Sequence, residues 1–274
     1  MRSAADSPQA ALPTLHVLGA GRAGAALARA LCRCDAVAMG VVCNNSLESA
    51  REAVGFIGAG QAKATLAGID GGLLMIGVPD ASIGAAASAA AKAGARIEIA
   101  FHLSGQHDAR VLEPLANAGA ATASMHPVVS FARPELAVQR LAEAWCVLEG
   151  DTAALGVLRR LCQALGMHCI EARGVDKPLY HAATVAASNL VCALLDLSAR
   201  LAERAGLEPG EAQPLLNHLA AQLVANAQQV GPRGALTGPI ERGDTAACQR
   251  VASAVGDSMT AADRRAFFAL ADLT

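Results

Sequence analysis

The sequence predicts an α/β domain built on a doubly wound sheet, followed by an all-helical domain. Apolar runs alternate with helix-forming stretches from Leu15 to about Gly174, an alternation typical of sheets whose strands are connected by helices. After Gly174 the strand patterns stop, and Ala- and Leu-rich helical stretches follow. We therefore expect a disordered tail at residues 1–12, an α/β domain at 13–172 and a helical domain at 173–274.

The composition indicates a globular protein without a charged surface for nucleic acid or membrane. Of 274 residues, 53% are hydrophobic and 17% are charged, and the net charge of −2 gives no basic surface for nucleic acid or anionic membrane. Mean hydropathy is +0.35, but no window approaches the ~18 uninterrupted apolar residues that a membrane span needs. Eight cysteines without a CxxC pair, and an N-terminus without an apolar signal segment, favour reduced thiols and the cytoplasm.

The α/β half contains a series of apolar runs in a regular order. The predicted strands are 15–19, 36–43, 62–64, 72–80, 96–105, 120–127 and 144–150, and 168–174 is the last segment before the helical half. Helices are expected at 25–34 and from about Leu47. The run at 72–80 is nearly continuous in apolar residues, as expected for a strand that is covered on both faces.

A glycine loop joins the first strand to the first helix. Gly19, Gly21 and Gly24 form GxGxxG in this strand–turn–helix context, which gives the spacing its meaning. The first glycine permits a tight turn, the second lets the backbone approach a pyrophosphate, and the third lets helix and strand pack closely. The predicted cofactor-binding residues here are Gly19, Ala20, Gly21, Arg22, Ala23 and Gly24. A tight turn without a ligand is the alternative.

The end of the second strand favours NADP(H) over NAD(H). NAD sites usually place Asp or Glu at this position, but this chain has Asn44, Asn45 and Ser46, which we also assign to cofactor binding. A 2′-phosphate would meet no carboxylate there. Arg22 and Arg51 are possible phosphate partners, although solvated surface arginines would look the same.

Several polar side chains follow other strands, where ligands bind in open α/β sheets. Val78 and Pro79 are expected to contact the cofactor, while His102, Ser104 and His126 are candidates for substrate binding. The alternative is structural: His102 would cap a strand end, Ser104 would cap a helix starting near Asp108, and His126 would be packed and satisfied.

The stretch "DKPLYHAATVAASN", Asp176–Asn189, predicts a helix with one polar stripe. Lys177, His181, Thr184 and Ser188 follow at steps of four, three and four residues, while the opposite side is apolar enough to be buried. Asp176 can cap the helix and Pro178 is tolerated in its first turn, so Lys177 is held at a helix start.

Taken together, these motifs resemble a known family. "HVLGAGRAG", "IGVPD", "HLSG", "MHPVVSF", "KPLYHAATVAASN" and "ALTGPIERGD" occur in the order found in the Rossmann-like, DUF2520-containing oxidoreductases. That family is similar to ketopantoate reductase, pyrroline-5-carboxylate reductase and the 6-phosphogluconate and hydroxyisobutyrate dehydrogenases. The resemblance implies an NAD(P)-binding Rossmann domain, and a helical domain of the 6-phosphogluconate dehydrogenase C-terminal type that shapes the substrate cleft and a homodimer interface.

The resemblance also implies catalytic residues. In the ketopantoate reductase and hydroxyacid dehydrogenase branches, a lysine at the start of this helix faces the reacting carbonyl, with an asparagine further along. Lys177 and Asn189 occupy comparable places, but the interval is longer and His181 stands about where that asparagine would. A positioned ammonium or imidazolium can stabilise negative charge on oxygen and donate a proton. Lys177 is the first candidate for that role and His181 the second, with Ser188 and Asn189 orienting the substrate.

The loop at 237–244 carries a further group of polar residues. Arg242 could bind a substrate carboxylate through a bidentate pair, and Thr237 could line the cleft. Asp244 is a natural N-cap for the next helix, which is the structural alternative.

The leading hypothesis is an NADPH-dependent reductase of a small polar carbonyl compound, such as a 2-oxo acid related to ketopantoate. An imine reductase of the pyrroline-carboxylate type is the nearest rival, and a non-catalytic NADP-binding sensor or scaffold is a third reading. Because no HxxH or HExxH spacing occurs, we expect no metal site.

Overall fold

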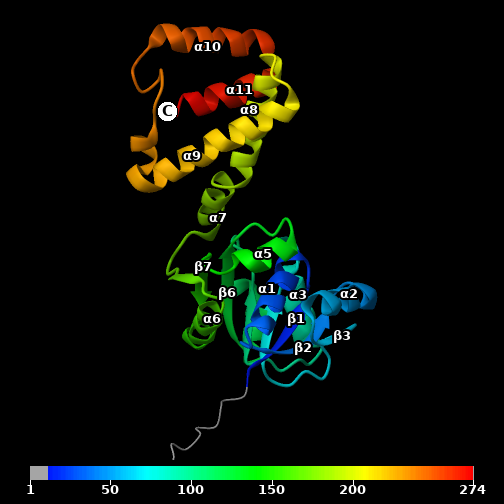
Figure 1. Ribbon diagram of the computed structural model, residues 1–274. Coiled ribbons are helices and arrows are strands. Elements are labelled where there is room, and N and C mark those ends of the chain that lie inside the picture. The colour runs from blue at the N-terminus through cyan, green and yellow to red at the C-terminus, as the bar shows by residue number, and fades with distance from the viewer. Residues whose placement is uncertain (1–11, 274) are drawn as a thin grey trace, which may run out of the picture. The chain divides into compact units, whose positions relative to one another are not determined.

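The computed structural model describes residues 12–273 and divides the chain into two compact units, 1–184 and 185–274 (Figure 1). Each unit is described by itself below. The predicted tail at residues 1–12 falls outside the described residues except for Leu12.

The first unit contains a single eight-stranded sheet, in the order β3-β2-β1-β4-β5-β6-β7-β8. The strands are β1 (Thr14–Leu18), β2 (Ala38–Cys43), β3 (Gln61–Lys63), β4 (Leu73–Ile76), β5 (Ile99–His102), β6 (Ala121–Val128), β7 (Trp145–Gly150) and β8 (His168–Glu171). Neighbouring strands are parallel except β6 and β7, which pair antiparallel. The predicted doubly wound sheet is confirmed; the one antiparallel pair was not expected, because an apolar run does not encode strand direction.

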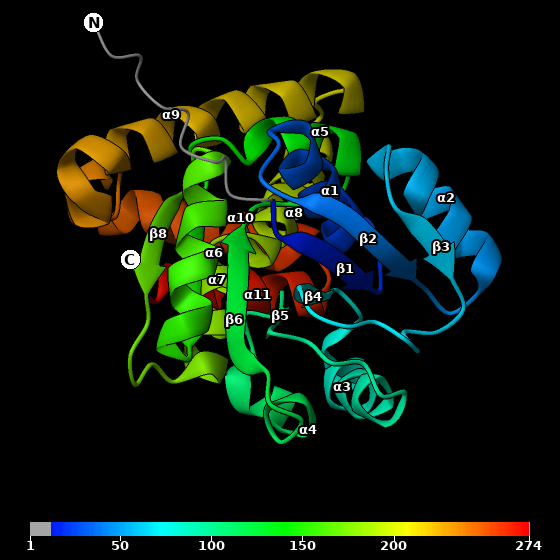
Figure 2. The same ribbon diagram turned by 90° about the horizontal axis from the view of Figure 1, so that it is seen from below.

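Helices cover both faces of this sheet. They are α1 (Arg22–Arg33), α2 (Leu47–Ile57), η1 (Asp80–Ser82), α3 (Ile83–Lys92), η2 (Ala109–Leu112), α4 (Glu113–Ala116), α5 (Pro134–Arg140) and α6 (Thr152–Ala164). Figure 2 shows α2 and β3 at one end of the sheet and α6 and β8 at the other. One core packs α1 and α6 against the sheet, and a second packs α3 and α4 against the opposite face. Strand β4, between these cores, is buried along its whole length, as its apolar sequence predicted.

A bulge interrupts the pairing of β1 with β2. Leu15 pairs with Met39 but Val17 pairs with Val42, so β2 has one additional residue in this interval. The N–H of Val41 donates instead to Nδ1 of His16, at 3.0 Å. A Cβ at Gly40 would lie 2.6 Å from that imidazole ring, so glycine is needed beside it. His16 therefore has a structural role, because it accepts the N–H of Val41 that the bulge leaves without a backbone partner on β1.

Helix α7 (Lys177–Ala186) differs from the predicted helix with one polar stripe in two ways. The helix ends before Ser188, which adopts φ −130° and ψ −76° as the N-cap of α8, so Ser188 lies off the stripe. The burial is also the reverse of the expectation, because Lys177 is buried while the apolar Leu179 is 69% exposed. The predicted cap is confirmed, since Asp176 Oδ1 accepts from the N–H of Leu179 at 3.0 Å.

The second unit is all-helical, as predicted. It contains α8 (Asn189–Arg204), α9 (Pro209–Ala235), α10 (Thr245–Ser258) and α11 (Ala261–Ala271). Helix α9 kinks at Gly231, where φ is 77° and ψ is 163°. Asp244 caps α10 through the N–H of Ala247, as its sequence position suggested.

The helical unit has a small core and a large apolar surface. Its core consists of Leu197, Val255 and Met259, packed with Leu201, Phe267 and Phe268. The exposed large apolar side chains of this unit are Leu190, Val191, Leu194, Leu215, Leu219, Leu223, Val224, Val230, Ile240, Val251, Leu270 and Leu273. Contiguous exposed apolar surfaces of large area mark interaction sites.

One segment of the described chain is long and apolar enough to cross a membrane. It is Lys177–Arg204, which covers α7 and α8. This result rests on length and composition alone, whereas the prediction that no segment spans a membrane rests on the absence of an uninterrupted apolar run. The helix breaks at 187–188 within the segment.

Candidate functional site

The glycine loop takes the form that its spacing predicts. Gly19 has φ +86°, and a Cβ there would lie 2.5 Å from Val78 Cγ1, so only glycine fits. A Cβ at Gly24 would lie 2.6 Å from the carbonyl oxygen of Gly19, which explains the close approach of helix and strand. At Gly21 a Cβ would meet only Gly77 O, at 3.9 Å. The protein itself leaves space at Gly21, as a loop that admits a phosphate requires.

The start of α1 is open to an anion. Gly21 is its N-cap, no side chain caps it, and both Gly21 and Arg22 are exposed. A helix start without a capping oxygen offers N–H groups and a partial positive charge. Val78 touches the loop through its approach to Gly19, and Pro79 follows it on the surface. The residues present therefore fit a pyrophosphate.

Of the three residues that follow β2, Asn44 and Ser46 make local hydrogen bonds, and Asn45 faces solvent. Asn44 Oδ1 accepts from the N–H of Ala20 at 2.6 Å, and its Nδ2 donates to Ser49 O at 3.0 Å. Ser46 Oγ accepts from Ser49 N–H and so caps α2. Asn45 is exposed. The sequence predicts that the side chains of Asn44 and Ser46 bind the cofactor. In the structure, both side chains make local hydrogen bonds instead.

His102 and Ser104 lie inside the loop that follows β5. The ring of His102 is fully buried; Nδ1 accepts from Ser104 N–H and Nε2 donates to Asp108 O, both at 3.1 Å. Burial lowers the pKa of His102 to about 4, so the ring is neutral. Ser104 Oγ accepts from the N–H groups of Gln106 and His107. The contacts of His102 match its structural alternative, the capping of a strand end. The helix near Asp108 is capped by Asp108 itself, whose Oδ1 accepts from Arg110 N–H, and not by Ser104.

Lys177 is inserted into the end of the sheet. It is 4% exposed, and Nζ donates to Ser124 Oγ at 2.9 Å, while Ser124 Oγ donates to Ser104 O at 3.3 Å. Burial lowers the pKa of Lys177, against the charges of Glu149 and Asp108, which raise it. Ser124 pairs in register with His102, the last residue of β5, so the ammonium lies at the carboxyl end of a strand. Ser124 was missed, although a serine within an apolar strand was visible in the sequence.

His126 and two neighbours on α7 form a ring cluster beside Lys177. His126 Nδ1 shares a 2.7 Å hydrogen bond with the hydroxyl of Tyr180. The rings of His126 and His181 lie 6.3 Å apart, and Lys177 Nζ lies 5.9 Å from the centre of the Tyr180 ring. His181 Nδ1 is buried and has no partner among residues 12–273. Tyr180, the chain's single tyrosine, was also missed, because it lies off the polar stripe.

Burial and neighbouring charges shift the pKa values of the groups in this cluster at the carboxyl edge of the sheet. Burial, with Lys177 and His181 nearby, lowers the pKa of His126 to about 4. Asp80, which follows β4, acts on His126 and His102 in the opposite sense. Burial raises the pKa of Tyr180. Predicted site residues Lys177, His181 and His126 are therefore brought together by the first unit.

Four predicted substrate-binding residues belong to the second unit. Ser188 Oγ donates to Asn189 Oδ1 at 3.0 Å, at the start of α8. Thr237 and Arg242 are exposed in the segment between α9 and α10. Their placement beside the strand ends stays a prediction.

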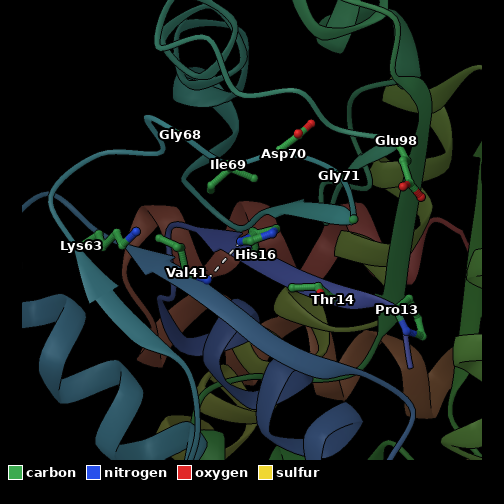
Figure 3. Close-up of a pocket in the computed structure, with 11 residues that line it drawn as sticks. Pro13, Thr14, His16, Val41, Lys63, Gly68, Ile69, Asp70, Gly71 and Glu98 are labelled. Carbon is green, nitrogen blue, oxygen red and sulfur yellow. Dashed lines mark hydrogen bonds between the residues drawn. The ribbon is translucent and has the colours of Figure 1, made fainter. Parts of the chain in front are cut away.

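A separate pocket of about 450 Å³ opens near the beginnings of β1 and β4 (Figure 3). Its lining residues are Pro13, Thr14, His16, Val41, Lys63, Gly68, Ile69, Asp70, Gly71, Gly72 and Glu98. None of them was predicted to act in binding or catalysis. Within the described residues, no group of three or more His, Cys, Asp or Glu side chains could hold a metal ion.

Two family descriptions cover almost the whole chain. Residues 2–127 match the Rossmann-like domain, and residues 144–273 match the domain of unknown function DUF2520. The chain combines a Rossmann-like domain with a DUF2520 domain. No curated protein sequence matches it.

Solved structures share the fold of this DUF2520-containing protein along most of its length. BF3122 from Bacteroides fragilis, provisionally named an NADP oxidoreductase, is 20% identical, with a TM-score of 0.73, over 94% of this chain and 96% of that chain. An imine reductase from Pseudomonas sp. is 19% identical, with a TM-score of 0.67, over 94% and 92%. A pyrroline-5-carboxylate reductase from Coxiella burnetii is 14% identical, with a TM-score of 0.62, over 93% and 97%. At these identities the likeness establishes the fold.

Proposed function

We propose that the protein is an NADPH-dependent oxidoreductase that reduces a small polar carbonyl compound. The observation that carries this proposal is that one edge of the sheet holds both a glycine loop with open space at Gly21 and the buried ammonium of Lys177. The names of the three similar structures, an NADP oxidoreductase, an imine reductase and a pyrroline-5-carboxylate reductase, support NADPH-dependent reduction.

The cofactor would be held by the glycine loop and the start of α1. Gly21 and the first N–H groups of α1 would receive the pyrophosphate, and the exposed Arg22 is proposed as a phosphate partner. The bound nicotinamide would supply hydride to the substrate. NADP(H) is proposed over NAD(H) because Asn44, Asn45 and Ser46 place no carboxylate directly after β2.

Lys177 would stabilise the negative charge that develops on the substrate oxygen. Its ammonium is nearly removed from water, where a fixed charge acts more strongly than in solvent. The bond to Ser124 Oγ fixes its position. His181, one turn further along α7, is proposed as the second polar group of the site, with its unpartnered Nδ1 available to a ligand.

Two classes of substrate fit the proposed reaction. A 2-oxo acid, similar to ketopantoate, needs both charge stabilisation and a proton at oxygen. A cyclic imine of the pyrroline-carboxylate type is favoured by two of the similar structures and needs less proton donation. Ser188, Asn189, Thr237 and Arg242 of the helical unit are proposed to orient the substrate carboxylate or hydroxyl.

The helical unit is proposed to form a homodimer. Its exposed leucines and valines gather on helices whose own core is small, and a second copy would remove them from water. The eight cysteines are free, which agrees with the cytoplasm as the proposed location.

The function is tested by cofactor titration followed by a substrate panel. NADPH and NADH are titrated by calorimetry, and NADPH oxidation is then followed with 2-oxo acids, including ketopantoate, and with cyclic imines. Lys177→Met should lower turnover of an oxo acid by about 10²–10³-fold, while Lys92→Met, at the exposed end of α3, should not change it. Turnover of imines alone, unaffected by Lys177→Met, would support the imine alternative. NADPH binding without any turnover would support the sensor reading.

A further inference from the structure

We propose that the phenol of Tyr180 delivers the proton to the substrate and that His126 restores it. This inference rests on the proposed function and deepens it, since it assigns to a third group the proton that Lys177 was expected to donate. Tyr180 and His126 come from α7 and β6, and they are joined only by the packing of that helix on the sheet.

Lys177 is poorly placed to donate a proton repeatedly. Its side chain is 4% exposed, and one of its N–H groups is held by Ser124 Oγ. A proton lost from Nζ would have to be replaced through the protein interior. The ammonium therefore acts as a fixed positive charge, 5.9 Å from the centre of the Tyr180 ring, where it stabilises a phenolate.

Tyr180 has the route to solvent that Lys177 lacks. Its hydroxyl shares a 2.7 Å hydrogen bond with His126 Nδ1. His126 is half-buried, and its Nε2 has no hydrogen-bond partner among residues 12–273, so we assign proton exchange with water to this atom. The His126 ring is seated on the loop after β5, because Gly105 has no Cβ; one would lie 2.8 Å from the ring.

Each proton that moves in this step has a donor and an acceptor. A bound nicotinamide would supply hydride to the substrate carbon, and the two π electrons of the double bond would move to the oxygen or nitrogen. The O–H bond of Tyr180 breaks, and its proton forms the new O–H or N–H bond of the product. The Nδ1 proton of His126 moves to the phenolate while Nε2 takes up a proton from solvent, and exchange of the ring protons with water then restores the starting tautomer. The ring remains neutral and only exchanges tautomers, in keeping with its lowered pKa of about 4.

Several charged and titratable groups surround this pair. They are Lys177 and His181 on α7, Asp80 after β4 and Cys146 on β7. Burial is the largest influence on Tyr180 and raises the pKa of its phenol. The proton is thus held until charge develops on the substrate.

The first test reads Tyr180 directly, without turnover. Because the chain has one tyrosine, ¹³Cζ-tyrosine labelling gives a single NMR signal, whose pH titration reports this phenol. In the free protein the phenol should titrate above its position in the unfolded chain. With NADP⁺ bound, whose nicotinamide ring is positive, the pKa of Tyr180 should be lower than with NADPH bound, whose ring is neutral, since all other charges of the two cofactors are the same.

The outcomes separate this inference from the proposed function. Failure of both cofactors to bind would overturn the proposed function and the inference with it. Binding of both with the same Tyr180 titration would overturn only the inference, because the phenol would then lie away from the nicotinamide. Titration at the unfolded position in the free protein would also overturn it.

The second test uses variants on whichever substrate is reduced. Tyr180→Phe should lower kcat by about a hundredfold or more, leave NADPH affinity unchanged and abolish the solvent deuterium isotope effect on hydride transfer. His126→Gln should lower kcat as well, while His168→Gln, on β8 and stacked on Trp145 outside the cluster, should behave as wild type. Full activity of Tyr180→Phe would overturn the inference.

Discussion

At the scale of single residues, the structure distinguishes glycines that the fold needs from a glycine that a ligand would need. Gly19 and Gly24 have no room for a Cβ, whereas at Gly21 the nearest atom is Gly77 O, at 3.9 Å. The motif spacing alone does not make this distinction. It follows from which backbone segments approach each position in the folded chain.

We expect Gly21→Ala to weaken NADPH binding by about tenfold or more without lowering thermal stability, since the new methyl would occupy only ligand space. Gly24→Ala should destabilise the fold by about 1–3 kcal/mol, because its methyl would collide with Gly19 O. Gly156→Ala, in α6 with no neighbour within 4 Å, is the matched control and should bind NADPH normally. Calorimetry and thermal melts measure both properties. An equal loss of stability in Gly21→Ala and Gly24→Ala would contradict this assignment.

His102 should make the free energy of unfolding depend on pH in the acidic range. Its pKa is lowered from 6.5 to about 4, so the unfolded chain takes up a proton as pH falls below 6.5 while the folded chain does not until about pH 4. Stability contributed by the neutral ring is therefore lost across this window, by up to about 3 kcal/mol. The free energy of unfolding in urea should fall less steeply in His102→Gln than in wild type, and His218→Gln, exposed on α9, should follow wild type. Parallel pH profiles for His102→Gln and wild type would refute it.

At the scale of elements, Asn44 connects the glycine loop to α2. Asn44 Oδ1 accepts from Ala20 N–H, and Asn44 Nδ2 donates to Ser49 O. A single side chain therefore holds the glycine loop and α2 together. Its neighbour Asn45 makes no such bridge and is exposed.

Asn44→Ala should destabilise the first unit by about 1–3 kcal/mol, because the buried N–H of Ala20 would lose its acceptor. NADPH binding should weaken too, since the loop that receives the phosphates would no longer be held. Asn45→Ala is the matched control for stability. Urea unfolding with and without NADPH tests this, and wild-type stability in Asn44→Ala would show that the bridge is dispensable.

Helix α7 shows how an element can be predicted correctly and its burial incorrectly. The start at Lys177 and the cap by Asp176 depend on residues within one turn, which the sequence displays. The burial of Lys177 depends on Ser124, 53 residues away in the chain. The end of the helix before Ser188 also escaped the periodicity, because the polar stripe continues in sequence where the backbone turns.

At the scale of the whole molecule, the two units differ in how well they cover their apolar side chains. The sheet has two extended cores, whereas the helical unit has one small cluster and a long row of exposed leucines on α9. Leu215, Leu219 and Leu223 follow at intervals of four, so they share one face of that helix. This contrast supports the proposal that a second copy covers the helical unit.

Sedimentation equilibrium should therefore find a dimer of the wild-type chain. Leu219→Glu with Leu223→Glu should shift it towards monomer and lower its thermal stability, because charges would replace apolar side chains in the interface. Gln228→Glu adds a charge to the opposite face of α9 and should leave the dimer intact. A wild-type monomer, or a double variant that dimerises normally, would contradict the dimer.

The sequence by itself determined what local rules encode: the alternation of strands and helices, the glycine loop, the change to an all-helical half, and the caps at Asp176 and Asp244. Only the tertiary structure decided which polar groups meet. It placed His102 and Ser104 in loop-forming bonds, buried Lys177 against Ser124, and joined Tyr180 to His126, residues 54 positions apart. The reason is physical: a cap or a turn forms among neighbours in the chain, whereas the burial and partners of a side chain depend on distant segments that pack against it.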